Sequence, residues 1–170
     1  MKYFNGFSLS KEEIFFTEQL VESKYVVAGF SFGAQKAFEY AYASTERIDR
    51  LILLSPAFFQ NHKKSFIKTQ LRYYKADEKS YTKQFLKNVT FPSSEQLNDY
   101  LSQGTYTELE ELLSYVWESD KLKELNKRGV TIEVFMGEKD KIVDVSKSFE
   151  FFSELSNVYL IKDVGHLLQK

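Results

Sequence analysis

One short segment of the chain has the residue types of an activated nucleophile. Residues 29–33 read Gly-Phe-Ser-Phe-Gly, so Ser31 stands between two glycines with one residue on each side. A nucleophilic serine needs an exposed hydroxyl, a nearby base and amide donors for the charge that develops on the attacked oxygen, and a sharp strand-to-helix turn supplies much of this. The pattern makes Ser31 a candidate nucleophile, and a tight turn in some other α/β sheet is the alternative.

Two backbone amides are candidates for holding the developing oxyanion. The Phe32 amide would lie at the start of the following helix, where the helix dipole favours negative charge. The second donor in such a site comes from the loop after an earlier strand, and residues 5–7, Asn-Gly-Phe, are positioned for that role. We expect the Phe7 amide to be this second donor.

A base and an acid should follow later strands, because sites in parallel sheets form at the C-terminal ends of the strands. The strand expected over residues 130–136 leads into Gly-Glu-Lys-Asp, which ends at Asp140, and the last strand leads into Gly-His, which ends at His166. We predict His166 as the general base of Ser31 and Asp140 as the acid that orients it. The order serine, acid, histidine along the chain fits this arrangement.

Other readings of these residues stay open. Glu138 and Asp144 are rival acids, Asp140 is also suited to capping a loop, and His166 is also suited to a place on the surface near the end of the chain. His62 lies among polar residues and is expected to have no catalytic part. Ser55 precedes a proline and reads as a turn residue.

The candidate residues require an α/β fold with a mostly parallel sheet of about five strands and flanking helices. Alternating strands and helices also predict right-handed crossovers. A capping-box pattern, Ser10 with Glu13, predicts a helix from there to about Val21. The other expected elements are strands at 2–4, 25–28, 48–54, 130–136 and 158–161 and helices at 34–43 and 145–155.

The middle of the chain differs from the rest. Residues 58–128 show no strand pattern and are amphipathic, so we expect a helical lid inserted into a core formed by residues 1–57 and 129–170. Eight basic residues lie within 61–90, whereas 91–120 carry seven acids and no lysine or arginine. Such blocks of opposite charge indicate a segment distinct from the core.

Composition excludes several classes of function. The chain has no cysteine and two histidines, which argues against disulfides, thiolate chemistry and a metal site, and no cofactor is expected. The net charge of −1 and the acidic block argue against nucleic acid as a partner. No signal peptide or membrane span is apparent, so we expect a cytoplasmic protein without membrane contact.

These motifs resemble the α/β-hydrolase superfamily. The resemblance rests on the Gly29 to Gly33 turn, the strand end Leu-Ile-Leu-Leu-Ser-Pro at 51–56, and the loops that end at Asp140 and His166. The chain departs from the family in its shortness, since strands that usually precede the nucleophile strand are missing, and in having Asn5-Gly6 where many members carry His-Gly.

In its compactness, with Gly-Phe-Ser-Phe-Gly-Ala at 29–34 and Leu-Ser-Pro-Ala-Phe at 54–58, the chain resembles the short pimeloyl-acyl carrier protein methyl ester esterases of biotin synthesis, the BioV group. The resemblance implies hydrolysis of the methyl ester of pimeloyl-acyl carrier protein, with small acyl esters as further substrates. A general short-chain carboxylesterase or an acyl thioesterase with the same three residues is the runner-up. A non-catalytic module that binds acyl groups or carrier proteins is an alternative of another class.

An acidic carrier protein would require a basic surface near the pocket. Basic residues recur every three or four positions between 64 and 87, and we expect four of them to contact the carrier protein: Lys64, Lys68, Arg72 and Lys75. Four aromatic residues are expected to line the acyl channel: Phe58, Phe66, Tyr73 and Tyr74. Ordinary solvated and core faces of lid helices explain both sets equally well.

Overall fold

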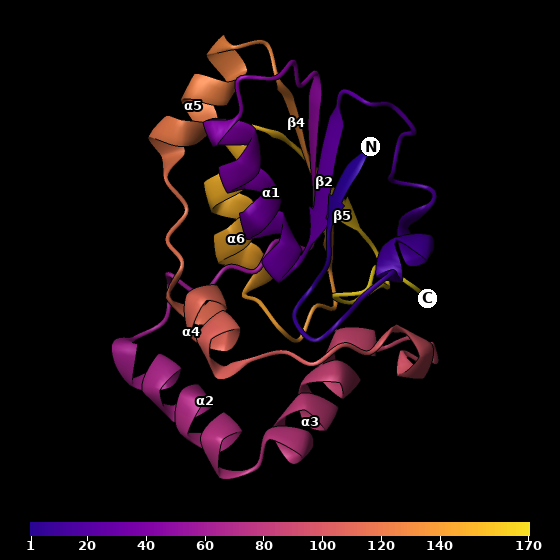
Figure 1. Ribbon diagram of the computed structural model, residues 1–170, viewed down its shortest axis with the longest axis vertical. Helices are drawn as coiled ribbons and strands as arrows, with labels where there is room; N and C mark the ends of the chain where they lie inside the picture. Colours follow the sequence, from indigo (N-terminus) through magenta and orange to yellow (C-terminus); the bar gives the residue numbers. More distant parts are fainter.

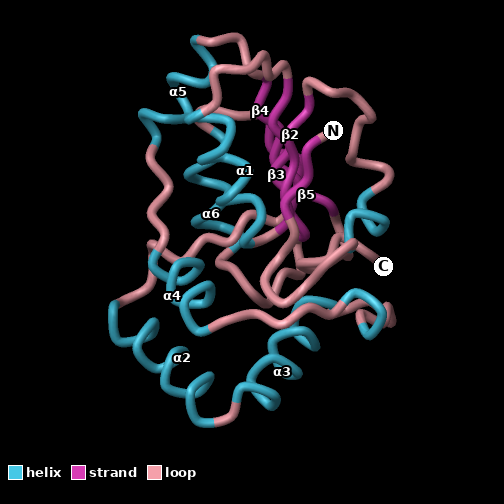
Figure 2. Tube along the Cα trace, viewed as in Figure 1, coloured by secondary structure: helices cyan, strands magenta, loops and turns pink.

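The computed structural model describes residues 1–170 and contains a five-stranded sheet with helices on both faces (Figures 1 and 2). The strand order in the sheet is the order in the chain, and every neighbouring pair is parallel. The C-terminal ends of all the strands therefore meet at one edge, as predicted. The strands are β1 (Lys2–Phe4), β2 (Val26–Phe30), β3 (Arg50–Leu54), β4 (Thr131–Gly137) and β5 (Asn157–Ile161).

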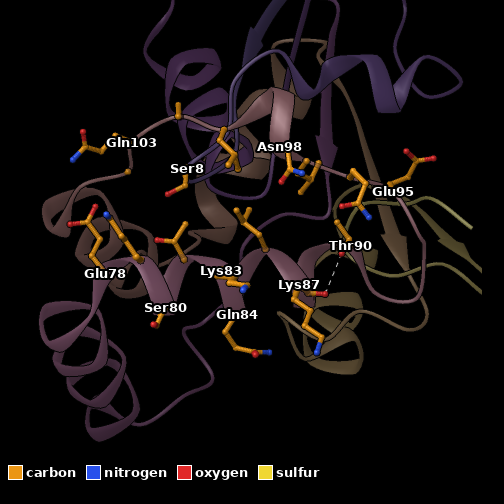
Figure 3. A pocket seen from close by; sticks show the side chains of 18 residues that line it. Ser8, Glu78, Ser80, Lys83, Gln84, Lys87, Thr90, Glu95, Asn98 and Gln103 are labelled. Carbon is orange, nitrogen blue, oxygen red and sulfur yellow. Dashed lines mark hydrogen bonds between the residues drawn. The ribbon is translucent and has the colours of Figure 1, made fainter.

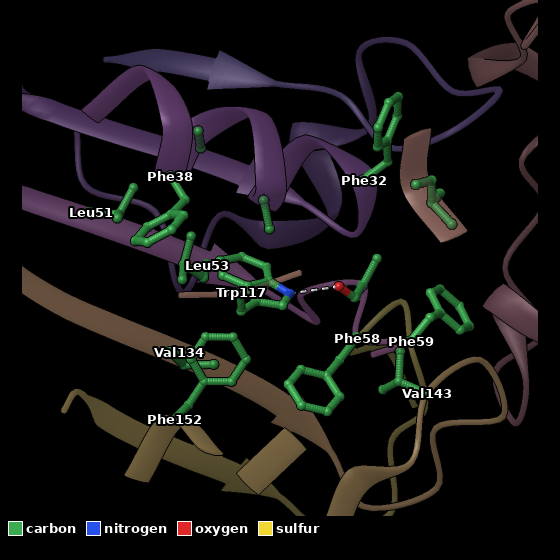
Figure 4. Close-up of a cluster of buried hydrophobic side chains, with 14 of the residues drawn as sticks. Phe32, Phe38, Leu51, Leu53, Phe58, Phe59, Trp117, Val134, Val143 and Phe152 are labelled. Carbon is green, nitrogen blue, oxygen red and sulfur yellow. Dashed lines mark hydrogen bonds between the residues drawn. The ribbon is translucent and has the colours of Figure 1, made fainter. Parts of the chain in front are cut away.

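Three helices cover one face of the sheet: α1 (Phe32–Ala43), α5 (Ser119–Lys127) and α6 (Val145–Ser153). Phe38 of α1 and Phe152 of α6 pack with Leu51, Leu53 and Trp117 in the larger core cluster (Figure 4). The indole nitrogen of Trp117 donates to the Ala57 carbonyl at 2.9 Å, so its one polar atom is satisfied inside the core. No helix of the protein combines the length and the apolar character needed to cross a lipid bilayer.

The connection from β1 to β2 covers the opposite face. It contains the 3₁₀ helix η1 (Glu12–Phe16), whose Phe16 packs with Ala28 and Phe30 of β2 in the second core cluster. Because β1, β2 and β3 follow one another across the sheet, the β1–β2 and β2–β3 connections move in the same direction. The first runs over one face and the second, which contains α1, runs over the other, so the two connections have opposite hands. The expectation that every crossover is right-handed is therefore wrong for one of these two connections.

The helix predicted from Ser10 to Val21 is also wrong. Only η1 forms, and Lys11, which precedes it, has a left-handed backbone with φ of 60° and makes no side-chain cap. The capping box fails because Glu12, next to the predicted Glu13, points into the interior and binds the backbone of the preceding loop. A tertiary contact has overridden the local signal.

The remaining helices lie beyond the C-terminal edge of the sheet (Figure 1). They are α2 (Lys64–Ala76), α3 (Glu78–Thr90), the short η2 (Asn98–Tyr100) and α4 (Tyr106–Ser114), and we call residues 64–114 the lid. The lid contains no strand. One of its residues, Leu101, forms an isolated antiparallel bridge with Leu9 of the loop after β1. Helix α5, which follows the lid, packs against α1 and β4 instead.

Close packing of α1 against β1 yields a test of the fold. A methyl group on Gly33 would lie 2.0 Å from the Phe4 carbonyl oxygen, a backbone atom that cannot move aside. We expect Gly33→Ala to lower the free energy of unfolding by about 3 kcal/mol. Gly129→Ala is the control, because Gly129 has a left-handed φ of 82° but open space around it, and should cost about 1 kcal/mol. Equal losses in urea unfolding would contradict this packing.

Candidate active site

Ser31 lies at the sharp turn between β2 and α1. Its backbone angles, φ of 54° and ψ of −112°, are strained for a residue with a side chain. The glycines on either side permit the turn, since a methyl group on Gly29 would lie 2.2 Å from the Gly33 carbonyl oxygen. The turn is further held by two amides, of Ala34 and Ala57, which donate to the Ser31 carbonyl at 3.1 and 3.2 Å.

The structure brings Ser31, His166 and Asp140 into one hydrogen-bonded chain. The His166 Nε2 atom is 2.9 Å from the Ser31 hydroxyl oxygen, and Nδ1 is 2.6 Å from an Asp140 carboxylate oxygen. The His166 side chain is 0% exposed and that of Asp140 is 2% exposed. A hydroxyl, an imidazole and a carboxylate in this order are the components that let a serine attack a carbonyl group.

Of the three candidate acids, only Asp140 reaches the histidine. Its other oxygen accepts hydrogen bonds from the amides of Ile142 and Val143, at 2.6 and 3.2 Å, so the carboxylate is held on both sides. Asp144 instead caps α6 by accepting from the Lys147 amide, and Glu138 is exposed. The preference for Asp140 over these rivals agrees with this geometry.

The loop that carries His166 is tied to β3 and to the lid. The Ser55 hydroxyl donates to the His166 carbonyl oxygen at 2.6 Å, and the Leu167 amide donates to the Val89 carbonyl of α3 at 3.1 Å. Gly165 lies so close to the Phe91 carbonyl that a methyl group there would be 1.7 Å from it. Sequence reasoning treated Ser55 as a turn residue and missed that it positions the histidine; its place directly after a strand end was the available signal.

Both amides expected to bind an oxyanion are unpaired. Neither the Phe7 nor the Phe32 amide donates a hydrogen bond within the protein, although Phe7 is only 2% exposed. Buried amides without a partner are rare, so these two are candidates for binding a ligand atom. The Phe7 ring packs edge-on against Tyr74 and Phe85, which places the loop directly under the lid.

An apolar cavity of about 320 Å³ lies between the lid and the Asp140 loop. Among the predicted channel residues, Phe66 and Tyr73 line it, together with Phe59, Leu113 and Ile142. The other two predicted channel residues do not line it. Phe58 packs against Phe151 and Phe152 in the core, and Tyr74 is buried with its hydroxyl donating to the Gly104 carbonyl. Tyr74 differs because the packing of α2 against α3 and α4 decides which face of α2 points into the cavity, whereas Phe58 precedes the lid and belongs to the core below it.

The predicted basic residues form an exposed row on α2. Lys64, Lys68, Arg72 and Lys75 are all exposed, and none takes part in an ion pair. A polar groove of about 700 Å³ lies along the neighbouring α3, between this helix and residues 95–104 (Figure 3). Three further unpaired lysines of α3 line the groove: Lys79, Lys83 and Lys87.

The site is closed and carries no metal-binding cluster. Ser31 is only 2% exposed, so its hydroxyl is covered in this structure. No group of three or more histidine, aspartate or glutamate side chains is arranged to hold a metal ion. The groups that meet at the site are a hydroxyl, an imidazole, a carboxylate and backbone amides, and their burial strengthens the electrostatic interactions between them.

The fold is shared with known hydrolases. The carboxylesterase CesB from Bacillus subtilis is 20% identical with a TM-score of 0.55, over 92% of this chain and 57% of that one. The naproxen esterase (carboxylesterase NP) of the same species is 18% identical with a TM-score of 0.56, over 84% and 53%. MenH from S. aureus is 18% identical with a TM-score of 0.60, over 96% and 85%. The chain thus spans little more than half the length of the two esterases, and these likenesses show the fold.

Sequence comparison identifies the family. No curated protein matches the chain in sequence. The family model described as serine aminopeptidase, S33, matches residues 13–168, which is most of the chain and includes Ser31, Asp140 and His166. The chain therefore belongs to the serine aminopeptidase S33 family of α/β-hydrolases, a family of serine hydrolases.

Proposed function

We propose that the protein is a serine carboxylesterase in which Ser31 is the nucleophile, His166 the general base and Asp140 the orienting acid. The observation that carries the proposal is the hydrogen-bonded chain from the Ser31 hydroxyl through both ring nitrogens of His166 to Asp140. With Nδ1 protonated and donating to Asp140, Nε2 accepts the hydroxyl proton as the serine oxygen attacks the ester carbonyl carbon. Asp140 then stabilises the imidazolium that forms.

The two unpaired amides complete the proposed mechanism. The tetrahedral oxyanion accepts hydrogen bonds from the Phe7 and Phe32 amides, which need no reorganisation because they are already free. The intermediate collapses, the alkoxide leaves with the proton from His166 as an alcohol, and an acyl-enzyme remains. Water then attacks the acyl carbon and gives a proton to His166, which returns it to Ser31 as the carboxylic acid is released.

The cavity, which reaches the Asp140 loop at Lys141 and Ile142 but is not lined by Ser31 or His166, favours an apolar group such as an acyl chain as its occupant. Its volume is at the small end of ligand pockets, and its wall is mostly apolar, with polar groups from Gln70, Gln84, Asn88 and Lys141. A flexible acyl chain of moderate length fits such a space, whereas a large polar substrate does not. This favours an ester hydrolase over an enzyme that acts on bulky polar substrates.

We further propose that the natural substrate is the methyl ester of pimeloyl-acyl carrier protein. The unpaired basic row on α2 supports an acidic protein partner, because eight bases in residues 61–90 make no internal ion pair. The motifs that resemble the BioV group support the choice of this substrate. A general carboxylesterase and an acyl thioesterase are the other outcomes of a substrate panel.

The first test of the proposal is removal of the nucleophile. Ser31→Ala should lower kcat for a simple acyl ester by about a million-fold, because the residual rate comes only from binding and the oxyanion donors. It should also abolish labelling by a fluorophosphonate, whereas His62→Ala, which changes the other histidine, should keep the label. Failure of the wild-type protein to label would favour a non-catalytic acyl-binding module.

A second test separates the acids. Asp140→Asn should lower kcat by about 10⁴-fold, because the amide favours the wrong histidine tautomer, while its oxygen still accepts from the loop amides and preserves the fold. The control Asp144→Asn keeps a side-chain oxygen that caps α6 about as well, because Asn and Asp are comparable at this position, and should leave both kcat and stability nearly unchanged. The reverse result would assign the acid to Asp144.

A third test concerns the carrier protein. Lys68→Glu combined with Arg72→Glu should lower kcat/KM for a carrier-bound methyl ester by about tenfold or more and leave hydrolysis of small free esters unchanged. The control pair Lys24→Glu with Lys127→Glu makes the same change in net charge at exposed positions near the N-terminal ends of β2 and β4. Equal loss in both pairs would show an effect of net charge and contradict docking on α2.

A further inference from the structure

Glu12 is a fully buried carboxylate without a cationic partner. It is 0% exposed, and one of its oxygens, Oε1, accepts hydrogen bonds from the Gly6 amide at 2.7 Å and the Tyr3 hydroxyl at 3.3 Å. The other oxygen has no partner. Burial raises the pKa of Glu12 above its ordinary value, although the bond from the Gly6 amide acts in the opposite direction. An acid at such a position is costly, and that cost calls for a structural or functional reason.

Glu12 acts on the loop that contains the Phe7 amide. The Gly6 amide, which donates its hydrogen bond to Glu12, belongs to the peptide plane between Asn5 and Gly6. The next plane contains the Gly6 carbonyl, which accepts from the Leu9 amide at 3.2 Å, and the Phe7 N–H. Because carbonyl and N–H point in opposite directions across a trans peptide, the Phe7 N–H is directed away from Leu9.

The two planes meet at Gly6, whose backbone angles decide how one is turned relative to the other. Glycine is the most permissive residue, so nothing intrinsic to Gly6 selects the observed geometry. Packing restricts the position itself, since a methyl group on Gly6 would lie 2.8 Å from the Phe30 ring. The Glu12 carboxylate holds the first plane and the Leu9 amide the second, so together they determine the direction of the Phe7 N–H.

We propose that Glu12 is a positioning residue that orients the Phe7 amide toward the developing oxyanion. The inference rests on the proposed function, in which this amide is one of two oxyanion donors. Glu12 touches neither substrate nor Ser31 and works through the Gly6 amide. Glu12 lies six residues after Gly6 in the chain. The turn between them, in which Ser8 has a left-handed φ of 59°, brings the two residues together.

The experiment compares three substitutions that separate the position of the acceptor oxygen from its charge. Glu12→Gln keeps an oxygen at the same reach and should retain kcat within about threefold. Glu12→Asp keeps the carboxyl group but withdraws it by one methylene, and should lower kcat about 10- to 100-fold. Glu12→Ala removes the acceptor and should lower kcat at least as far. KM for a simple acyl ester should change by less than about twofold in all three, since only the oxyanion needs the donor.

A second readout excludes a merely structural effect. Inhibition by an acyl trifluoromethyl ketone, which forms a tetrahedral oxyanion on the serine, should weaken in Glu12→Asp by the same factor as kcat. The control Glu39→Gln changes a carboxylate that likewise accepts a tyrosine hydroxyl, from Tyr115 at 2.6 Å, far along α1. It should lower thermal stability without changing kcat or inhibition.

The outcomes are distinguishable. If Glu12→Asp keeps the wild-type kcat, or if Glu12→Gln loses as much as Glu12→Asp, Glu12 does not act by placing an acceptor at Gly6 and the inference is overturned. If Glu12→Ala does not fold, the comparison of Gln with Asp still decides it. If the wild-type protein fails to react with a fluorophosphonate, the proposed function fails instead, whatever the Glu12 variants do.

Discussion

A buried imidazole is the constraint around which this structure is organised. Because the His166 side chain is 0% exposed, both of its ring nitrogens need partners in the buried site, and they find them in Ser31 and Asp140. Its backbone carbonyl is bound by Ser55. Segments that follow four different strands must therefore converge within hydrogen-bonding distance, and only the aligned C-terminal ends of parallel strands bring such distant segments together.

Glycines allow these segments to approach. Gly33 lets α1 start against the end of β1, and Gly137 lets the end of β4 contact the histidine loop, where a methyl group would lie 2.1 Å from the Gly165 carbonyl. Side chains at these positions would push the strand ends apart. A small sheet is sufficient for the site because each of its five strands ends in a loop that supplies or supports a candidate catalytic group.

The parts of the site that follow simple rules could be predicted from the sequence. The Gly29 to Gly33 turn is local, and the rule that parallel strands end at one edge was enough to select His166 and Asp140. What could not be predicted depends on contacts between distant segments. The bond from Ser55 to His166 spans 111 positions, and Glu12 reads as a surface acid until the loop folds over it. The wall of the cavity likewise depends on how three lid helices pack against one another, and the hydrophobic pattern of each helix taken alone does not predict that packing.

The attachment of the histidine loop to α3 couples the position of His166 to the position of the lid. Because the Leu167 amide donates to the Val89 carbonyl and Gly165 packs on the Phe91 backbone, the end of α3 helps to hold the loop that carries His166. The partner atoms on the lid side belong to the backbone, so a lid of different sequence keeps these contacts only if its chain follows the same path past residues 89 and 91. Chimaeras that graft a relative's lid to alter substrate range must therefore preserve the course of the backbone at the end of α3, because a shift there would move the loop that carries His166.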